Sequence, residues 1–240
     1  MLVAVVTGGS RGIGRAIAQR LGGAGTAVVV NYRTDGAAAA EVVTAIETGG
    51  GRALSVRSDV SDPGQVRTLF DTAEQTFGGI DIVVSNAGIA RFAPLAEATD
   101  EDFDQQFAIN TKATFYILRE AANRLCDGGR IVLVSSGANR THRPGSGLYA
   151  AGKAASEQLV RVLARELAPR AITVNSVLPG AVRTDAPAAA GVGQLDRIAA
   201  TIPMGRVGEP TDIADIVAFL VSQEARWITG ASIPASGGAF

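Results

Sequence analysis

Thr7-Gly8-Gly9-Ser10-Arg11-Gly12-Ile13-Gly14 is the stretch of sequence that decides the fold. It follows an apolar, β-branched run, Leu2–Val6, and it opens a helical pattern over residues 12–24. Glycines let a backbone turn tightly and approach a pyrophosphate closely, and a helix N-terminus offers unpaired N–H groups and partial positive charge. A glycine cluster alone also fits an ordinary tight turn. The strand before it and the helix after it favour a dinucleotide-binding turn.

The alternation of strand and helix continues along the chain. Most of the apolar runs are continuous, which is typical of strands covered by helices on both faces. The predicted strands are Leu2–Val6, Thr26–Asn31, Ala53–Arg57, Ile80–Ser85, Arg130–Ser135, Ala171–Val177 and Ala231–Pro234. The predicted helices span residues 12–24, 35–48, 62–77, 100–125, 147–168 and 210–222. We expect a Rossmann-type α/β fold, a doubly wound parallel sheet of about seven strands with helices on both faces.

The chain shows no sign of a division into domains. No linker, low-complexity tract or repeat interrupts its 240 residues, so we expect a single domain over residues 1–240 that holds both the dinucleotide and the catalytic groups. Residues 185–208 are rich in Ala, Gly and Pro and break the strand–helix rhythm. We predict that this segment is a mobile lid over the substrate.

Composition excludes several classes of function. A formal net charge of -1 provides no basic face for nucleic acid. The single cysteine, Cys126, rules out an intrachain disulfide and fits a reducing compartment, and we expect it to serve in packing. No apolar run approaches the roughly 20 residues of a membrane span. No cationic region precedes the first apolar strand, as it would in a signal peptide. We expect a cytoplasmic protein with no nucleic-acid or membrane partner.

The glycine spacing, Gly-x-x-x-Gly-x-Gly, resembles that of the classical short-chain dehydrogenase/reductase family. The resemblance covers essentially the whole chain. Residues 30–33, 202–206 and 208–210 look most like the 3-oxoacyl-(acyl-carrier-protein) reductase-like group. Asn86-Ala87-Gly88 is similar to the family's motif after the fourth strand, with Ser85 in place of the usual first Asn. The resemblance implies a Rossmann fold, a hydride-transfer activity and a homotetramer.

Tyr149 and Lys153 lie four residues apart on a predicted helix and so share one face. A free phenol has a pKa of about 10. We expect the Lys153 ammonium, together with the positive charge of an oxidised nicotinamide, to lower the pKa of Tyr149. The phenol would then pass a proton to a carbonyl oxygen as hydride reaches the carbon. A tyrosine and a lysine four residues apart are common on helices. The pair therefore indicates a catalytic site only together with the other motifs.

The resemblance adds two residues to this pair. Ser136 lies at the C-terminal end of the fifth predicted strand, directly after Ser135, and it is preferred to Ser135 because its spacing to Tyr149 matches the family's. Its hydroxyl would hold and polarise the substrate oxygen. Asn110 falls where the family has an asparagine that supports a proton-relaying water. The expected catalytic set is therefore Asn110, Ser136, Tyr149 and Lys153.

The same resemblance implies a cofactor site that runs from the glycine turn to the sixth strand. Asp59-Val60 resembles the adenine-contacting pair, and the turn from Pro179 to Thr184 resembles the one that receives the nicotinamide carboxamide. The expected cofactor-binding residues are Gly8, Ser10, Arg11, Gly12, Ile13, Gly14, Asn31, Tyr32, Arg33, Asp59, Val60, Asn86, Ala87, Gly88, Tyr149, Lys153, Pro179, Gly180, Val182 and Thr184.

The end of the second predicted strand favours NADP(H). A carboxylate there would select NAD by accepting hydrogen bonds from the ribose hydroxyls and would repel a 2′-phosphate. Tyr32 stands at that position, and Arg33 and Arg11 can clamp a phosphate with planar guanidinium groups. Asp35 is a nearby acid and keeps NAD(H) possible. Both arginines also fit ordinary solvated surface charges.

Several features give no clear assignment. His142 lies in a loop near the expected cleft, and Arg140 and Arg143 flank it, where they fit either an anionic substrate or solvent. One His and one Cys provide no credible metal set. The substrate is a small-molecule or carrier-bound carbonyl compound, and acyl-carrier-protein thioesters, small diketones, sugars, steroids and polyketides all fit, as do both directions of reaction.

The leading hypothesis is an NADPH-dependent reductase that converts a ketone to a secondary alcohol. The alternatives are a non-catalytic dinucleotide sensor or scaffold, an NAD(H)-dependent alcohol or sugar dehydrogenase, and an epimerase or dehydratase. A sensor would need none of Ser136, Tyr149 and Lys153, and the last class usually has a larger substrate domain. The Ala-rich faces of residues 100–125 and 147–168 are expected to pack across subunits of the homotetramer.

Overall fold

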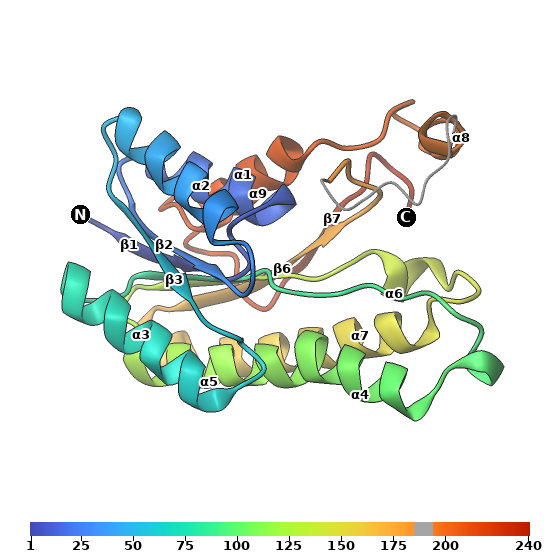
Figure 1. Ribbon diagram of the computed structural model, residues 1–240, viewed down its shortest axis with the longest axis horizontal. Coiled ribbons are helices and arrows are strands. Elements are labelled where there is room, and N and C mark those ends of the chain that lie inside the picture. The colour runs from blue at the N-terminus through green and yellow to red at the C-terminus, as the bar shows by residue number, and fades with distance from the viewer. Residues whose placement is uncertain (185–193) are drawn as a thin grey trace.

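In the computed structural model, which describes residues 1–184 and 194–240, one parallel sheet forms the centre of the molecule (Figure 1). Its strands are β1 (Val3–Val6), β2 (Ala27–Tyr32), β3 (Ala53–Arg57), β4 (Ile82–Ser85), β5 (Arg130–Val134), β6 (Thr173–Pro179) and β7 (Ser232–Ala235). They lie in the order β3-β2-β1-β4-β5-β6-β7, and all pairs are parallel. The expected doubly wound sheet is confirmed, and its strand order reverses between β1 and β4.

Helices cover both faces of this sheet (Figure 1). One layer consists of α1 (Gly12–Gly22), α2 (Gly36–Thr48) and α9 (Pro210–Leu220), and the other of α3 (Pro63–Phe77), α5 (Ala113–Arg124) and α7 (Gly147–Leu167). Successive strand residues point to opposite faces. Val6 and Val30 accordingly join the core under α1, whereas Val5 and Val29 join the core under α3. Double burial explains why these strands are continuously apolar.

The predicted continuous helix over residues 100–125 is wrong. α4 (Asp100–Phe107) ends in a turn of π-helix, Ala108–Lys112, and α5 begins after it. Turns of this kind often mark functional sites. Two short helices, α6 (Ala138–Thr141) and α8 (Gln194–Thr201), have no counterpart among the predicted elements.

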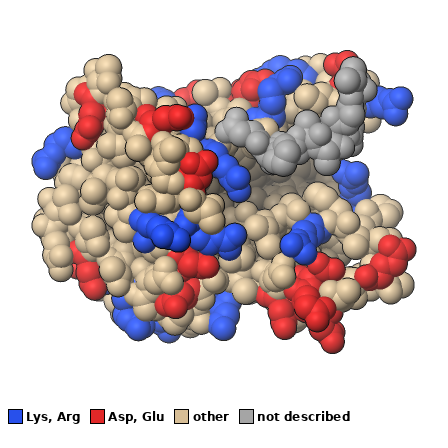
Figure 2. Space-filling view, viewed as in Figure 1, with Lys and Arg blue, Asp and Glu red and all other residues tan. Residues whose placement is uncertain are grey.

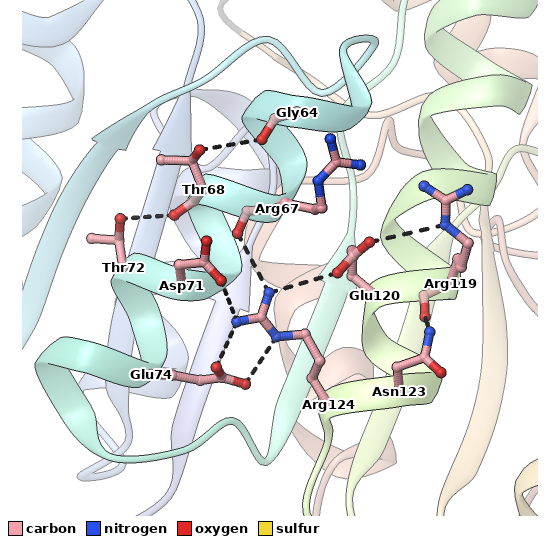
Figure 3. Close-up of polar contacts among 10 residues, drawn as sticks. All are labelled: Gly64, Arg67, Thr68, Asp71, Thr72, Glu74, Arg119, Glu120, Asn123 and Arg124. Carbon is pink, nitrogen blue, oxygen red and sulfur yellow. Dashed lines mark hydrogen bonds and ion pairs between the residues drawn. The ribbon is translucent and has the colours of Figure 1, made fainter.

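A cluster of ion pairs joins α3 to α5 (Figure 3). Arg124 on α5 lies 2.6 Å from Asp71, 2.5 Å from Glu74 and 3.6 Å from Glu120. Its hydrogen bonds to Glu74 and Asp71 raise the pKa of Arg124 above the ordinary arginine value. Arg124 ends α5 just before β5 begins, so the cluster lies at the opposite end of the sheet from the carboxyl ends of the strands.

Two observations concern the surface and the environment of the chain. Within the described ranges, no helix is both long enough and apolar enough to cross a membrane. Cys126 is exposed, so the expectation that it serves in packing is wrong. It follows α5 in the short connection to β5, and residues of such connections lie at the surface.

Candidate active site

A cavity opens at the carboxyl ends of β1, β2 and β4, where the strand order reverses and where open α/β sheets bind their ligands. Figure 2 shows that the viewed face is hollowed between the helices above and below the sheet. The predicted cofactor residues that line the cavity are Gly8, Ser10, Arg11, Gly12, Ile13, Gly14, Asn31, Tyr32, Arg33, Asp59, Val60, Asn86, Ala87, Gly88 and Thr184. Thr34, Asp35, Ser58, Ile89 and Ile109 line it as well, and the motifs do not indicate Thr34, Ser58, Ile89 or Ile109.

The glycine turn has the backbone shape that a phosphate cradle needs. Gly8 and Gly12 have φ angles of 62° and 52°, in the left-handed region that favours glycine. A Cβ atom at Gly14 would lie 2.2 Å from the Gly8 carbonyl oxygen, so no side chain fits there. The turn leads into the N-terminus of α1, whose first N–H groups favour an anion. This cradle fits the pyrophosphate of a dinucleotide.

Two asparagines hold the turn in place. The Asn31 side-chain oxygen accepts a hydrogen bond from Gly8 N–H at 3.2 Å, and its amide donates to Ser58 Oγ at 2.8 Å. Asn86 donates to the carbonyl oxygens of Thr7 and Gly8 at 2.9 and 3.2 Å. Asn31 is buried, so its side chain shapes the cavity wall through contacts within the protein.

Asp59 and Val60, the predicted adenine-contacting pair, line one end of the cavity, the predicted adenosine end. Its arginine side chains are more available to a ligand than its carboxylates are. The Arg33 side chain is 58% exposed, and its guanidinium lies 3.9 Å from the Asp59 carboxylate, a loose ion pair. Asp35 is engaged differently, since its carboxylate accepts the Ala38 N–H at 2.9 Å and caps α2. Arg11 is exposed at the start of α1. Arg33 and Arg11 therefore present guanidinium groups to the cavity.

Lys153 and Asn110 lie behind Gly88, a residue of the wall of this cavity. Lys153 is buried on α7, and its Nζ donates to the Val134 carbonyl oxygen at 3.0 Å. A Cβ atom at Gly88 would lie 3.1 Å from Lys153 Nζ and 3.0 Å from Asn110 Oδ1. Gly88 lines the cavity, so one glycine of its wall separates both polar groups from it. Tyr149 precedes Lys153 by one helical turn on α7 and is half-buried.

The two neighbouring serines after β5 have different surroundings. Ser135 is buried, and its Oγ donates to the Glu157 carboxylate at 2.6 Å. Ser136 is half-buried, its Oγ accepts the Ala138 N–H at 3.2 Å, and its side chain hydrogen-bonds with the Tyr149 phenol. Ser136 is the serine that the structure brings to the tyrosine.

The π-helical turn fixes Asn110 against the loop after β4. Its side-chain oxygen accepts the Ile89 N–H at 3.1 Å, and its amide donates to the Ile89 carbonyl at 2.8 Å. Its own carbonyl accepts Ser156 Oγ from α7 at 2.7 Å. Asn110 thus ties the loop that carries Gly88 to the helix that carries Lys153.

Comparisons with known proteins agree with this geometry. A family model described as enoyl-(acyl carrier protein) reductase matches residues 8–239. The crystal structure of the angucycline C-6 ketoreductase LanV with bound NADP has a TM-score of 0.95 at 44% identity, over 99% of this chain and 95% of that chain. The chain belongs to the short-chain dehydrogenase/reductase family.

This chain matches two curated relatives over nearly their full lengths. Versicolorin reductase stcU of Emericella nidulans is 43% identical over 99% of this chain and 95% of its own length. The NADPH-dependent aldehyde reductase-like protein, chloroplastic, of Arabidopsis thaliana is 43% identical over 98% of this chain and 93% of its own. The predictions of an oxidoreductase that interconverts a ketone and an alcohol, with NADP(H) as its preferred cofactor, are confirmed.

The pKa of the Tyr149 phenol differs from the expectation that its surroundings lower it. The chain by itself does not make Tyr149 acidic: burial raises the pKa of Tyr149, and the hydrogen bond with Ser136 lowers it only in part. Burial also lowers the pKa of Lys153 to about 8, and the negative charge of Glu157 opposes that change. A phenol that keeps its proton at neutral pH suits an acid that gives a proton to a carbonyl oxygen.

Five predicted cofactor residues lie outside the cavity lining: Tyr149, Lys153, Pro179, Gly180 and Val182. Pro179 ends β6, and its carbonyl accepts the Gly137 N–H at 2.9 Å. Gly180 donates its N–H to the Ala235 carbonyl at 3.0 Å, and Val182 pairs with Gly208. They lead into Thr184, which does line the cavity. Of the predicted lid, residues 185–193 lie outside the described part of the chain, and residues 194–208 include α8.

The structure adds an aromatic side chain that the motifs do not indicate. Phe92 is 58% exposed, and its ring meets the Tyr149 ring edge-on at 5.8 Å. The Arg143 guanidinium lies 5.8 Å from the Phe92 ring. Its exposure beside the phenol is a tertiary property, and a phenylalanine in a loop with Ile, Ala, Pro and Leu gives little signal of it. His142 is exposed, and Arg140 pairs with Glu157.

Proposed function

We propose that this short-chain dehydrogenase/reductase reduces a ketone to a secondary alcohol with NADPH, and that Tyr149 donates the proton. The observation that carries the proposal is that Tyr149 meets Ser136 one helical turn from Lys153, and that Lys153 reaches Gly88 in the wall of the cavity that also contains the glycine cradle. Bound NADPH supplies the hydride. Ser136 would hold the substrate oxygen, and Tyr149 would protonate it.

Lys153 and Asn110 would support the phenol. The buried ammonium is held by the Val134 carbonyl, so its charge stays beside the cavity at Gly88. A positive charge there favours the phenolate that remains after proton donation. Asn110 binds the loop after β4 through both of its side-chain polar atoms. We infer that it keeps Gly88 and Lys153 in register, which leaves the water-relay role implied by the family resemblance to experiment.

Arg33 and Arg11 would select NADPH over NADH by binding the 2′-phosphate. Their guanidinium groups flank the adenosine end of the cavity, and Asp35 is engaged as a helix cap. Pro179, Gly180, Val182 and Thr184 would form the wall on the nicotinamide side. The glycine turn, Asp59-Val60 and Asn86-Ala87-Gly88 would hold the rest of the dinucleotide.

The substrate we propose is a flat, aromatic ketone. Phe92 offers an exposed ring next to the Tyr149 phenol, and Leu95, 68% exposed, packs near Gly147 at the start of α7. Aromatic rings stack on such surfaces with a gain of about 0.5–1.5 kcal/mol beyond area burial. One similar structure is named an angucycline C-6 ketoreductase, and one relative a versicolorin reductase.

A panel of carbonyl compounds with NADPH tests the proposal. It should contain polycyclic aromatic ketones, a 3-oxoacyl thioester, a steroid, a sugar and small diketones, with turnover followed by absorbance of the reduced nicotinamide. We expect the aromatic ketones to give the highest kcat/KM. A panel in which no ketone is turned over, although NADPH binds, would support a sensor instead.

We further propose that the protein acts in the cytoplasm as a homotetramer. Phe103 on α4, Phe115 on α5 and Val162 on α7 are each 41–47% exposed, on the helices that the family resemblance assigns to subunit contacts. Burial of these side chains between copies would remove apolar surface from water. Light scattering of the purified chain tests this, and a stable, active monomer would refute it.

A further inference from the structure

A carboxylate lies buried one helical turn beyond Lys153. Glu157 on α7 is 1% exposed, and one of its oxygens accepts Ser135 Oγ at 2.6 Å. The same oxygen accepts the Asn139 amide. Its other oxygen lies 3.1 Å from the Arg140 guanidinium. These three partners come from one segment, residues 135–140, and Ser136 lies within it.

Two further groups complete the shell around this carboxylate. Arg161, one turn along α7, lies 3.3 Å from Glu157, and Ser232 Oγ of β7 donates to it at 3.1 Å. A buried carboxylate is costly unless it is paired and hydrogen-bonded. Every contact just named supplies a donor, and two of the donors are cations. The site is thus fully built around a negative charge, which a glutamine at this position would not carry.

Position on the helix connects this shell to the reacting groups. Tyr149, Lys153 and Glu157 follow one another at intervals of four residues on α7, so their side chains share one face. The charge of Glu157 favours the protonated form of Lys153. The Lys153 ammonium is hydrogen-bonded to the neutral Val134 carbonyl, and the neutral Asn110 side-chain oxygen lies beside the same residue, Gly88. The titratable phenol of Tyr149 precedes Lys153 by one turn on the same helix face.

We propose that Glu157 is a positioning residue for the reduction: its carboxylate holds the segment that carries Ser136 against α7 and places a negative charge one turn from Lys153. In this proposal Arg140 binds the Glu157 carboxylate. It contacts neither an anionic substrate nor solvent alone, the two roles that fit the sequence. Because the ammonium of Lys153 and the hydroxyl of Ser136 would both act on the Tyr149 phenol, one carboxylate adjusts both. Only the expected kinetic effects of this inference rest on the proposed function.

The chain offers an unusually direct test, because its only lysines are Lys112 and Lys153. With ¹³C-labelled lysine, an NMR titration gives one signal for each, and exposed Lys112 serves as the internal reference. Glu157→Gln should move the Lys153 titration to lower pH than in the wild-type chain. Arg140→Met should move it to higher pH, since a cation that offsets Glu157 is removed. Glu120→Gln, in the Arg124 cluster far from the site, should leave it unchanged.

Kinetics of NADPH-dependent ketone reduction form the second arm. Glu157→Gln should lower kcat by about 10- to 100-fold through misplacement of Ser136, with NADPH affinity unchanged. The alkaline limb of its pH profile should move in the same direction as the Lys153 signal. Glu157→Asp should restore part of kcat.

Each outcome has a distinct meaning. Unmoved Lys153 signals, or signals displaced in the same direction by Glu157→Gln and Arg140→Met, would overturn the proposal. If Glu157→Gln fails to fold, Arg140→Met still tests the proposal, because the Arg140 side chain is half-exposed and its replacement disturbs the core less. A wild-type chain that reduces no ketone would refute the proposed function and leave the NMR result standing.

Discussion

Arg33→Ala tests how the protein chooses its dinucleotide. The Arg33 guanidinium faces the adenosine end of the cavity, where we assign the 2′-phosphate of NADPH. Its only described ion pair is a loose one, 3.9 Å from Asp59. Removal of the side chain therefore costs little within the protein, and the change in cofactor affinity reports on the phosphate contact.

The magnitude follows from the exposure of the side chain. Hydrogen bonds between charged groups contribute about 1.5–3 kcal/mol. The Arg33 side chain is 58% exposed, so solvent screening reduces that to about 1–2 kcal/mol. Since about 1.4 kcal/mol corresponds to a factor of ten, NADPH should bind about 5- to 30-fold more weakly. NADH, which has no 2′-phosphate, should bind as before.

The assay is a titration of the purified protein with each dinucleotide, together with kcat/KM for each on one ketone. Arg20→Ala is the matched control, because Arg20 on α1 is a half-exposed arginine in a surface ion pair with Asp215 on α9 and does not line the cavity. The NADPH effect should shrink as salt is added. Equal losses of NADPH and NADH affinity, or no loss of either, would refute the phosphate assignment.

Three further predictions concern the cradle, the phenol's neighbour and the lysine. Gly14→Ala should abolish dinucleotide binding, since its Cβ would collide with the Gly8 carbonyl; calorimetric titration that still detects binding would contradict this. Phe92→Ala should raise KM for aromatic ketones by about 2- to 10-fold and leave small ketones unaffected, and equal effects on both would count against the substrate class. The rate of reduction should be level below pH 8 and fall about tenfold per pH unit above it, because the Lys153 ammonium has a pKa of about 8 and is lost as pH rises; a limb that persists in Lys153→Met would assign it to another group.

The parts of the fold that depend on local sequence could be predicted. Strands buried on both faces must be continuously apolar, and the stretch Thr7–Gly14 must be rich in glycine where no Cβ atom fits, so both appear directly in the sequence. The break in the helix at Ala108–Lys112 could not be predicted. Its sequence suits an α-helix, and the π-helical turn depends on contacts of Asn110 with Ile89 and Ser156, which lie far away in the sequence.

The same division holds for the site. The spacing of Tyr149 and Lys153 on one helix places them together, and the sequence shows that spacing. The pKa of the phenol depends on how deeply Tyr149 is buried, which the sequence does not show, and the expected acidic phenol was therefore not found in the chain alone. From the sequence, Glu157 fits a solvent-facing charge on a helix. Its burial depends on contacts with Ser135 after β5, with α6 and with β7, which the sequence does not show.

Proton donation by Tyr149 is tested most directly by a single turnover of NADPH and an accepted ketone on Tyr149→Phe. Phenylalanine keeps the ring and its contact with Phe92 and removes only the hydroxyl. We predict a rate lower by about 10²- to 10⁴-fold, with the dissociation constant of NADPH nearly unchanged. A variant that oxidises NADPH at the wild-type rate, with the same ketone and the same alcohol product, would show that the proton comes from another group.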